Sequence, residues 1–135
     1  MTKLIIYTDG AARGNPGPAG AGVVIKDAGL KIVKELWDYL GETTNNQAEY
    51  RALIIALKSA AELGAGELDI FADSELMVSQ LKGLYKVKNE GLIPLFNEAV
   101  GLFKKFKSCR ISHVPREKNK EADRLANKAI DDYNK

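Results

Sequence analysis

The sequence contains only one cysteine and one histidine, Cys109 and His113, among its 135 residues. An internal disulfide needs two cysteines, so none can form within the chain. A structural zinc site built from Cys and His needs four such ligands, so the chain cannot supply one by itself. A domain of this length buries enough surface to fold without either kind of cross-link. We therefore expect residues 1–135 to form a single globular domain.

Long hydrophobic runs are also missing. The apolar segment near the N-terminus is interrupted by Asp9 and is too short for the core of a signal peptide. Charged residues recur along the whole chain, so no segment approaches the roughly 18 apolar residues that a membrane-spanning helix needs. The sequence therefore predicts a cytoplasmic protein that does not enter a membrane.

Positive and negative residues are nearly equal in number but unevenly distributed along the chain. The formal net charge at pH 7 is +2. Residues 1–80 contain 7 Lys or Arg against 11 Asp or Glu, whereas residues 81–135 contain 13 against 7. An acidic part can hold a metal ion and a basic part can attract a polyanion, although charged faces that are simply solvated give the same imbalance.

Hydrophobic patterning and turn residues predict strands first and then alternating helices and strands. The first strand is expected to end at the Asp9-Gly10 turn signal. Stretches rich in Ala, Leu and Glu, bounded by cap residues or glycine, are typical of helices. This order predicts an α/β fold, with a mixed sheet packed against helices. The expected strands are 3–8, 21–26, 30–40, 68–72 and 109–114, and the expected helices are 45–63, 92–106 and 118–133, with a further helix starting at Asp73-Ser74.

Two acidic side chains are expected on helix faces where a carboxylate is costly. Glu49 falls on the apolar face of helix 45–63 and should point toward the sheet. Burying an unpaired carboxylate costs several kcal/mol, so such a residue is usually paired, protonated or bound to metal. A Glu favoured by the helix dipole is the simpler alternative. Asp123 lies at the edge of the apolar stripe of helix 118–133, where an ordinary boundary residue is the alternative.

Two more acidic residues follow predicted strands. Asp9 comes after strand 3–8 and Asp73 after strand 68–72, and α/β sheets place their ligands at the carboxyl ends of strands. Each has a simpler interpretation as a turn or helix-cap residue. Four acids at one sheet edge would repel one another unless cations join them, and oxygen ligands select hard ions such as Mg²⁺ or Mn²⁺. The combination therefore predicts a divalent-metal site.

Such a site suits phosphodiester hydrolysis. One metal ion lowers the pKa of the attacking water, a second stabilises the leaving oxygen, and both neutralise charge on the phosphate. The sequence has no Gly-x-Ser-x-Gly nucleophile elbow, and its Gly-rich segment 13–18 lacks the Gly-Lys-Ser/Thr ending of a P-loop. A pair of glycosidase carboxylates would leave the other acids and the basic half without a role.

Four blocks of the sequence are specific enough to identify a family. They are Tyr7-Thr8-Asp9-Gly10-Ala11-Ala12-Arg13-Gly14-Asn15-Pro16-Gly17-Pro18, Thr43-Thr44-Asn45-Asn46-Gln47-Ala48-Glu49, Ala72-Asp73-Ser74 and Asn119-Lys120-Glu121-Ala122-Asp123-Arg124-Leu125-Ala126. In order and position they resemble the four signature blocks of ribonuclease HI. The match covers essentially the whole chain.

This resemblance implies a ribonuclease H-like fold, which is a five-stranded mixed sheet with its first three strands antiparallel, flanked by helices. It also implies an endoribonuclease that cleaves the RNA strand of RNA/DNA hybrids with two Mg²⁺ ions, for which Mn²⁺ is a possible substitute. Asp9, Glu49, Asp73 and Asp123 match the family's metal-binding catalytic carboxylates.

The resemblance further implies a set of substrate-binding residues. Three asparagines match residues that contact the hybrid in its minor groove, where the 2′-hydroxyl distinguishes RNA from DNA. Two other residues match a pocket for a phosphate of the DNA strand. Ordinary turn and cap chemistry is the alternative role for these side chains. The set comprises the minor-groove residues Asn15, Asn45 and Asn46, the phosphate-pocket residues Thr44 and Asn89, and Gly10.

The sequence departs from many members of the family in two places. Only the short segment 83–91 stands where those members carry a basic helical protrusion, which predicts weaker affinity for the hybrid. Many members also place a His on a flexible loop before the last carboxylate. His113 aligns either with that His or with the end of the last strand. We favour the second alignment, in which the loop is shortened and Arg116, the nearest replacement, assists catalysis.

Three functions are candidates for a sequence with these residues. The first is a ribonuclease acting on hybrids, the second is another nuclease of the same superfamily, and the third is a non-catalytic hybrid-binding module. Nucleases of the second kind usually lack the Asn-rich approach to the helix glutamate, present here at residues 44–47. A binding module would be expected to lose at least one carboxylate. We expect a monomer and leave activity on double-stranded RNA open.

Overall fold

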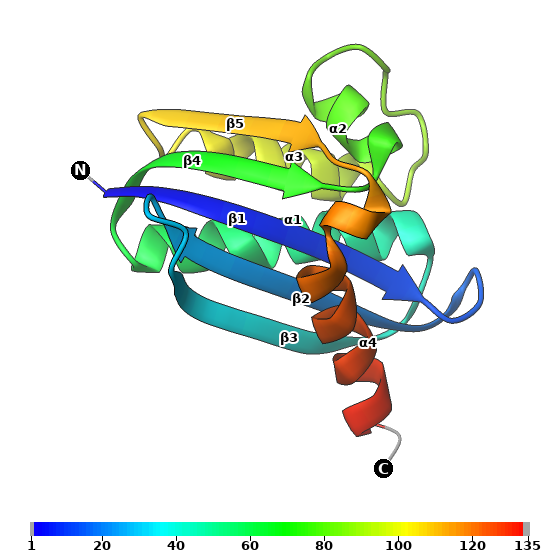
Figure 1. The fold of residues 1–135 in the computed structure, drawn as a ribbon. Helices are drawn as coiled ribbons and strands as arrows, with labels where there is room; N and C mark the ends of the chain where they lie inside the picture. The colour runs from blue at the N-terminus through cyan, green and yellow to red at the C-terminus, as the bar shows by residue number, and fades with distance from the viewer. Residues whose placement is uncertain (1, 134–135) are drawn as a thin grey trace.

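Five strands form one mixed sheet in the order β3-β2-β1-β4-β5 (Figure 1). We describe it from a computed structural model in which residues 2–133 are placed. The first three strands are antiparallel, and the last two run parallel to the first, which confirms the expected topology. The strands are β1 (Thr2–Ala12), β2 (Gly17–Asp27), β3 (Ile32–Thr43), β4 (Ala65–Ala72) and β5 (Ser108–His113).

Helices cover both faces of the sheet. The first and third pack on one face, and the last lies across β1, β2 and β3 on the other (Figure 1). Each corresponds to a helix predicted from the sequence, with ends that differ by up to three residues. None of these helices is long and apolar enough to cross a membrane. They are α1 (Asn45–Glu62), α2 (Glu75–Leu81), α3 (Ile93–Phe103) and α4 (Lys120–Tyr133), and a 3₁₀ turn (Arg116–Lys118) precedes the last.

The first strand is longer than predicted. A turn was expected at Asp9-Gly10, but β1 continues to Ala12 because it stays paired with β2, from Leu4↔Asp27 to Ala12↔Ala19. This pairing overrides the local turn signal. The parallel pairing of β1 with β4 ends earlier, at Thr8↔Ala72. Beyond Thr8, therefore, no described strand pairs with β1 on its β4 side. We call this side of β1, from the carbonyl group of Thr8 to Ala12, the free edge of β1.

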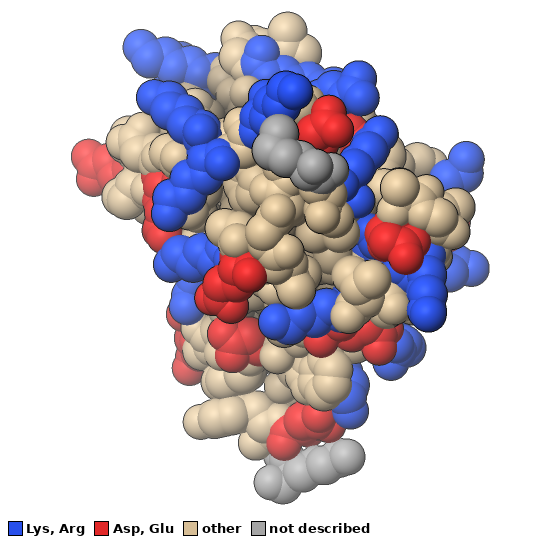
Figure 2. All heavy atoms as spheres, turned by 90° about the vertical axis from the view of Figure 1, so that its left-hand side faces the viewer, with Lys and Arg blue, Asp and Glu red and all other residues tan. Residues whose placement is uncertain are grey.

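The two charge classes do not separate onto opposite faces of the molecule. Figure 2 views the end where β1, β4 and β5 begin, which is opposite the end of β4 followed by Asp73. Lys and Arg side chains lie there among Asp and Glu side chains, with Lys and Arg more frequent in the upper half of the view. At this end of the molecule the charges therefore fit the simpler interpretation of a solvated surface.

The last helix packs very closely on β2. Its buried side is formed by Ala122, Leu125, Ala126, Ala129 and Ile130. A Cβ atom added to Gly22 would lie 2.1 Å from the carbonyl oxygen of Ala122 and 2.6 Å from the nitrogen of Ala126. Glycine at this position therefore sets the distance between the sheet and the helix that carries Asp123.

Gly22→Ala is expected to lower the free energy of unfolding by at least about 2 kcal/mol, because the new methyl group meets helix backbone that must move away. Gly29→Ala is the matched control, since its Cβ would meet nothing closer than 3.4 Å. Equilibrium unfolding in urea measures both. Equal stabilities of the two variants would contradict the close packing of α4 on β2.

Candidate active site

The free edge of β1 is occupied by side chains instead of a strand. Backbone groups at three alternate residues of β1 make hydrogen bonds with side chains from α1 and from the residue before α4. Alternate residues of a strand direct their backbone groups to the same edge, so all three bonds extend the sheet where β4 has ended. The bonds join Asn119 Nδ2 to Thr8 O (2.8 Å), Gly10 N to Glu49 Oε1 (2.9 Å) and Ala12 N to Asn45 Oδ1 (3.1 Å).

Glu49 is held in a buried position near the start of α1. The helix begins after Thr44, whose side chain accepts a hydrogen bond from the Gln47 amide. Glu49 is only 4% exposed and points toward the sheet, as its place on the apolar face predicted. A Cβ atom on Gly10 would lie 2.2 Å from the carbonyl carbon of Ala48. Glycine at residue 10 thus allows α1 to approach β1 closely enough for Glu49 to accept from the Gly10 amide.

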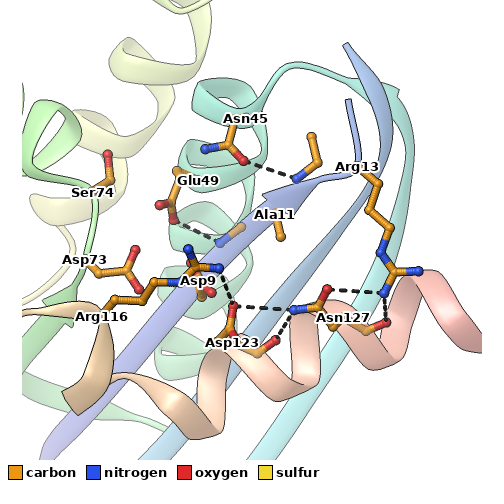
Figure 3. A pocket seen from close by; sticks show the side chains of 12 residues that line it. Asp9, Ala11, Arg13, Asn45, Glu49, Asp73, Ser74, Arg116, Asp123 and Asn127 are labelled. Carbon is orange, nitrogen blue, oxygen red and sulfur yellow. Dashed lines mark hydrogen bonds and ion pairs between the residues drawn. The ribbon is translucent and has the colours of Figure 1, made fainter. Parts of the chain in front are cut away.

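Asp9 and Asp73 meet Glu49 at the point where β1 and β4 separate. Asp73 directly follows β4, and Asp9 follows the last residue of β1 that pairs with β4. Asp9, Glu49 and Asp73 each offer an oxygen atom, and these atoms lie within 4.8 Å of one another. Figure 3 shows the three side chains directed toward a common space. Asp9 was expected at the end of a strand, but β1 continues past it to Ala12. Asp9 nevertheless lies where β1 and β4 stop pairing.

The three carboxylates have an unfavourable electrostatic environment. Burial raises the pKa of Asp9 well above its usual range, and the charges of Glu49 and Asp73 raise it further. Burial also raises the pKa of Glu49, with the charge of Asp73 adding to the effect. The Gly10 amide and the Arg116 guanidinium lower the Glu49 pKa, but they do not offset the burial. A group of this kind gains from a cation, and its all-oxygen donor set suits a hard divalent one.

Asp123 lines the same pocket but lies outside this compact group. It belongs to the first turn of α4. Its Oδ1 atom lies 3.7 Å from Arg116 Nη2 and accepts a hydrogen bond from Asn127 Nδ2 at 3.4 Å. The Arg116 side chain, 79% exposed, extends over Asp9 toward Asp123 (Figure 3). His113 is the last residue of β5, is exposed and does not line the pocket, an arrangement that agrees with the shortened-loop alignment.

The pocket around the carboxylates encloses about 490 Å³. Three polar residues that line it were not among the site residues predicted from the sequence. Two of them, Arg13 and Ser74, stand inside the blocks that identified the family. The third, Asn127, lies one helical turn after Asp123, which is a spacing that places two side chains on one helix face. Arg13 donates to Asn127 Oδ1 at 3.2 Å and forms an ion pair with Asp131, so it braces this side of the pocket.

The predicted substrate-binding residues line two separate hollows. A second hollow of about 210 Å³ is lined by Asn15, Thr44, Asn46 and Asn89, together with Gln47 and Leu92. Asn45 and Gly10 instead line the carboxylate pocket. A hydrogen bond links a residue of each hollow, because Asn15 Oδ1 accepts from the Asn45 amide at 3.0 Å. The structure therefore brings all six residues to the same side of the molecule as the carboxylates.

Two named relatives match most of this chain. A family model described as reverse transcriptase-like matches residues 7–129. Ribonuclease HI of Halobacterium salinarum (strain ATCC 700922 / JCM 11081 / NRC-1) is 45% identical over 130 residues, which are 96% of this chain and 65% of that protein. Ribonuclease H of Pseudomonas entomophila (strain L48) is 37% identical over 141 residues, covering 94% of this chain and 93% of that protein.

A solved structure shares both the fold and much of the sequence. LC11-RNase H1, determined in complex with an RNA/DNA hybrid, superposes with a TM-score of 0.93 at 46% identity, covering 98% of this chain and 99% of that chain. The chain spans only 36% to 65% of the length of the first curated relatives it matches. Because the family model covers most of the sequence and one ribonuclease H is matched over nearly its whole length, this chain belongs to the ribonuclease H family.

Proposed function

We propose that this chain is an endoribonuclease that hydrolyses the RNA strand of RNA/DNA hybrids. The observation that carries the proposal is the convergence of Asp9, Glu49 and Asp73 within 4.8 Å. The adjoining hollow, lined largely by asparagines and Thr44, offers uncharged hydrogen-bonding groups suited to sugar hydroxyls and base edges. The relative solved with an RNA/DNA hybrid supports the substrate class.

Two Mg²⁺ ions are the proposed cofactors, with Mn²⁺ as a substitute. The proposed ligands are the carboxylates of Asp9, Glu49, Asp73 and Asp123, and an all-oxygen set of this kind fits hard divalent cations. The raised pKa values of Asp9 and Glu49 support this fit, because positive charge relieves the repulsion that contributes to them. When bound, such ions supply an activated water and neutralise charge on the phosphate.

The chain's own residues prepare the site in two ways. The Gly10 amide orients Glu49, and burial keeps Glu49 and Asp9 away from bulk water. The exposed Arg116 guanidinium stands beside Asp123, where it can contact the scissile phosphate or the departing product. A guanidinium group offers several N–H donors and a positive charge, so it can act as an electrostatic helper without a proton transfer.

The proposed substrate contacts are of two kinds. We assign Asn15, Asn45 and Asn46 to the minor groove of the hybrid, where hydrogen bonds to the 2′-hydroxyl select RNA. We assign Thr44 and Asn89, which both line the second hollow, to a phosphate of the DNA strand. Several of these polar groups also make internal hydrogen bonds, such as Asn45 Oδ1 with the Ala12 amide, so they are held in place before substrate arrives.

Neither alternative function has a comparable observation behind it. A non-catalytic hybrid-binding module would not need Asp9, Glu49, Asp73 and Asp123 all lining one pocket, as they do here. A different nuclease of the superfamily would not need the asparagine-lined hollow. A monomer is the proposed working unit.

Asp9→Asn and Asp73→Asn are each expected to abolish cleavage while the protein stays folded, because each change removes a proposed metal ligand. The control is Asp69→Asn, which alters an acid that pairs with Lys3 and Arg110 outside the pocket. Cleavage of matched RNA/DNA, RNA/RNA and DNA/DNA duplexes, with and without Mg²⁺, is the measurement. Retention of more than about a tenth of wild-type turnover, a barrier change under ~1.4 kcal/mol, would contradict these roles.

In the absence of metal, the Asp9→Asn variant is expected to have a free energy of unfolding at least about 1 kcal/mol higher than that of the wild type at pH 8. Burial raises the Asp9 pKa above its ordinary value of 3.8, so the wild type loses stability as the pH rises above that value. The Asn variant escapes this loss. Its advantage should therefore shrink as the pH falls toward 4, which urea unfolding in EDTA measures. A pH-independent advantage would argue against a raised Asp9 pKa.

Arg116→Ala is expected to lower turnover by roughly one to two orders of magnitude, in the range usual for an electrostatic helper. His113→Ala should have a far smaller effect, because His113 ends β5 outside the pocket. Steady-state kinetics of both variants, and the pH profile of the wild type, test this. A titration near pH 6.5 that His113→Ala removes, with Arg116→Ala nearly normal, would make His113 the participating residue.

A further inference from the structure

We propose that Asn119 is a positioning residue, which fixes the Asp73 carboxylate in the orientation needed to hold a metal ion. This inference rests on the proposed function, because it takes Asp73 as a metal ligand. Asn119 opens the last of the four family blocks, but neither the sequence analysis nor the proposed reaction gives it a role. It is 1% exposed and therefore cannot contact the substrate itself.

The side-chain amide of Asn119 bridges two oxygen atoms. Its Nδ2 atom donates to Asp73 Oδ2 at 2.9 Å and to the carbonyl oxygen of Thr8 at 2.8 Å. A carboxylate and a carbonyl can only accept, so the amide must present its NH₂ group to both. The opposite orientation would place Asn119 Oδ1 against two other oxygens. The Asn119 Oδ1 atom has no hydrogen-bond partner within residues 2–133, so the two donated bonds are what the side chain contributes.

Few other side chains could replace this amide. Its two N–H groups satisfy two acceptors at once, whereas a serine hydroxyl offers one hydrogen and a carboxylate offers none. A lysine or arginine would bring a charge into a nearly inaccessible position, which is costly. The geometry therefore calls for an asparagine here.

Asn119 also connects the segments that carry the other carboxylates. Its side chain bonds to Thr8, next to Asp9 on β1, and to Asp73 after β4. Its backbone carbonyl accepts from the Asp123 amide at 3.1 Å, in the first turn of α4. A shift of Asn119 would therefore be transmitted to three of the four acids. Carboxylates that bind metal are commonly held by such hydrogen-bond partners, whose loss weakens metal binding.

The bond opposes a repulsion that would otherwise turn Asp73 away. The charge of Asp73 contributes to the raised pKa values of both Asp9 and Glu49, so the three carboxylates repel one another. An amide N–H stabilises the ionised carboxylate without adding negative charge. Asn119 can thus hold the Asp73 carboxylate in one orientation before a cation binds.

The test compares Asn119→Ser with Tyr50→Phe in hybrid-free protein. Serine is favoured before a helix, so α4 can still start, but its hydroxyl cannot make both bonds. Tyr50→Phe is the matched control, because it also removes a buried hydrogen bond, from Tyr50 to Gln80 Oε1 (2.6 Å), and neither residue lines the pocket. Calorimetric titration with Mg²⁺ and Mn²⁺ measures metal affinity, and urea unfolding in EDTA measures stability.

We expect both variants to lose stability but only Asn119→Ser to bind metal more weakly, by roughly tenfold or more. Turnover on the hybrid should fall while its KM stays the same, because Asn119 is buried. Metal affinity equal to that of the wild type would overturn the proposal and leave Asn119 as a structural brace. If the wild type itself neither binds metal nor cleaves the hybrid, the proposed function is wrong. The wild-type measurements alone show this, so that outcome is distinguishable from a failure of the Asn119 proposal.

A measurement on the wild type covers the case in which Asn119→Ser does not fold. The Asn119 side-chain amide resonances in a ¹⁵N-labelled sample should shift when Mg²⁺ is added, because Asp73 then shares its charge with the ion. The Gln80 side-chain amide, bonded to Tyr50, is the internal reference and should not move. Unchanged Asn119 resonances in a sample that binds Mg²⁺ would overturn the proposal.

Discussion

The early end of β4 is the feature on which the candidate site depends. β1 continues to Ala12 beside β2, but β4 stops at Ala72, opposite Thr8. The backbone groups left on the free edge of β1 need partners, since a buried unpaired amide or carbonyl is costly. Side chains from α1 and from the start of α4 supply them. Pairing of the sheet edge and placement of the site are therefore achieved by the same hydrogen bonds.

This arrangement brings together charges that repel one another. Asp9 and Glu49 are both 4% exposed, and both have a raised pKa. Among the described residues near them, Arg116 supplies positive charge but is largely exposed, so solvent weakens its effect. The rest of the fold holds the group together through close packing, with α1 against Gly10 and α4 against Gly22. Electrostatic repulsion of this kind, maintained by packing, is typical of a functional site.

Much of the fold follows from local sequence signals. Strand and helix segments, the cap at Ser74 and the inward position of Glu49 could be read from residue pattern, because burial and capping depend on spacing along the chain. The length of β1 could not be read from the residue pattern. Asp9-Gly10 has the composition of a turn, and only its pairing with Gly22 and Ala21 on β2 keeps it extended. Local propensity is weak compared with a complete ladder of hydrogen bonds.

The sequence by itself determined which residue types are present and in which order. The family blocks singled out the four carboxylates, and the shortened-loop alignment singled out Arg116. It could not separate Asp123 from the compact group of three, or place Asn45 in one hollow and Asn46 in the other. Those outcomes depend on where α1 and α4 meet the sheet. The role of Asn119 is likewise visible only in three dimensions, because its partners are 46 and 111 residues away along the chain. Tertiary packing alone brings such distant groups within hydrogen-bond distance.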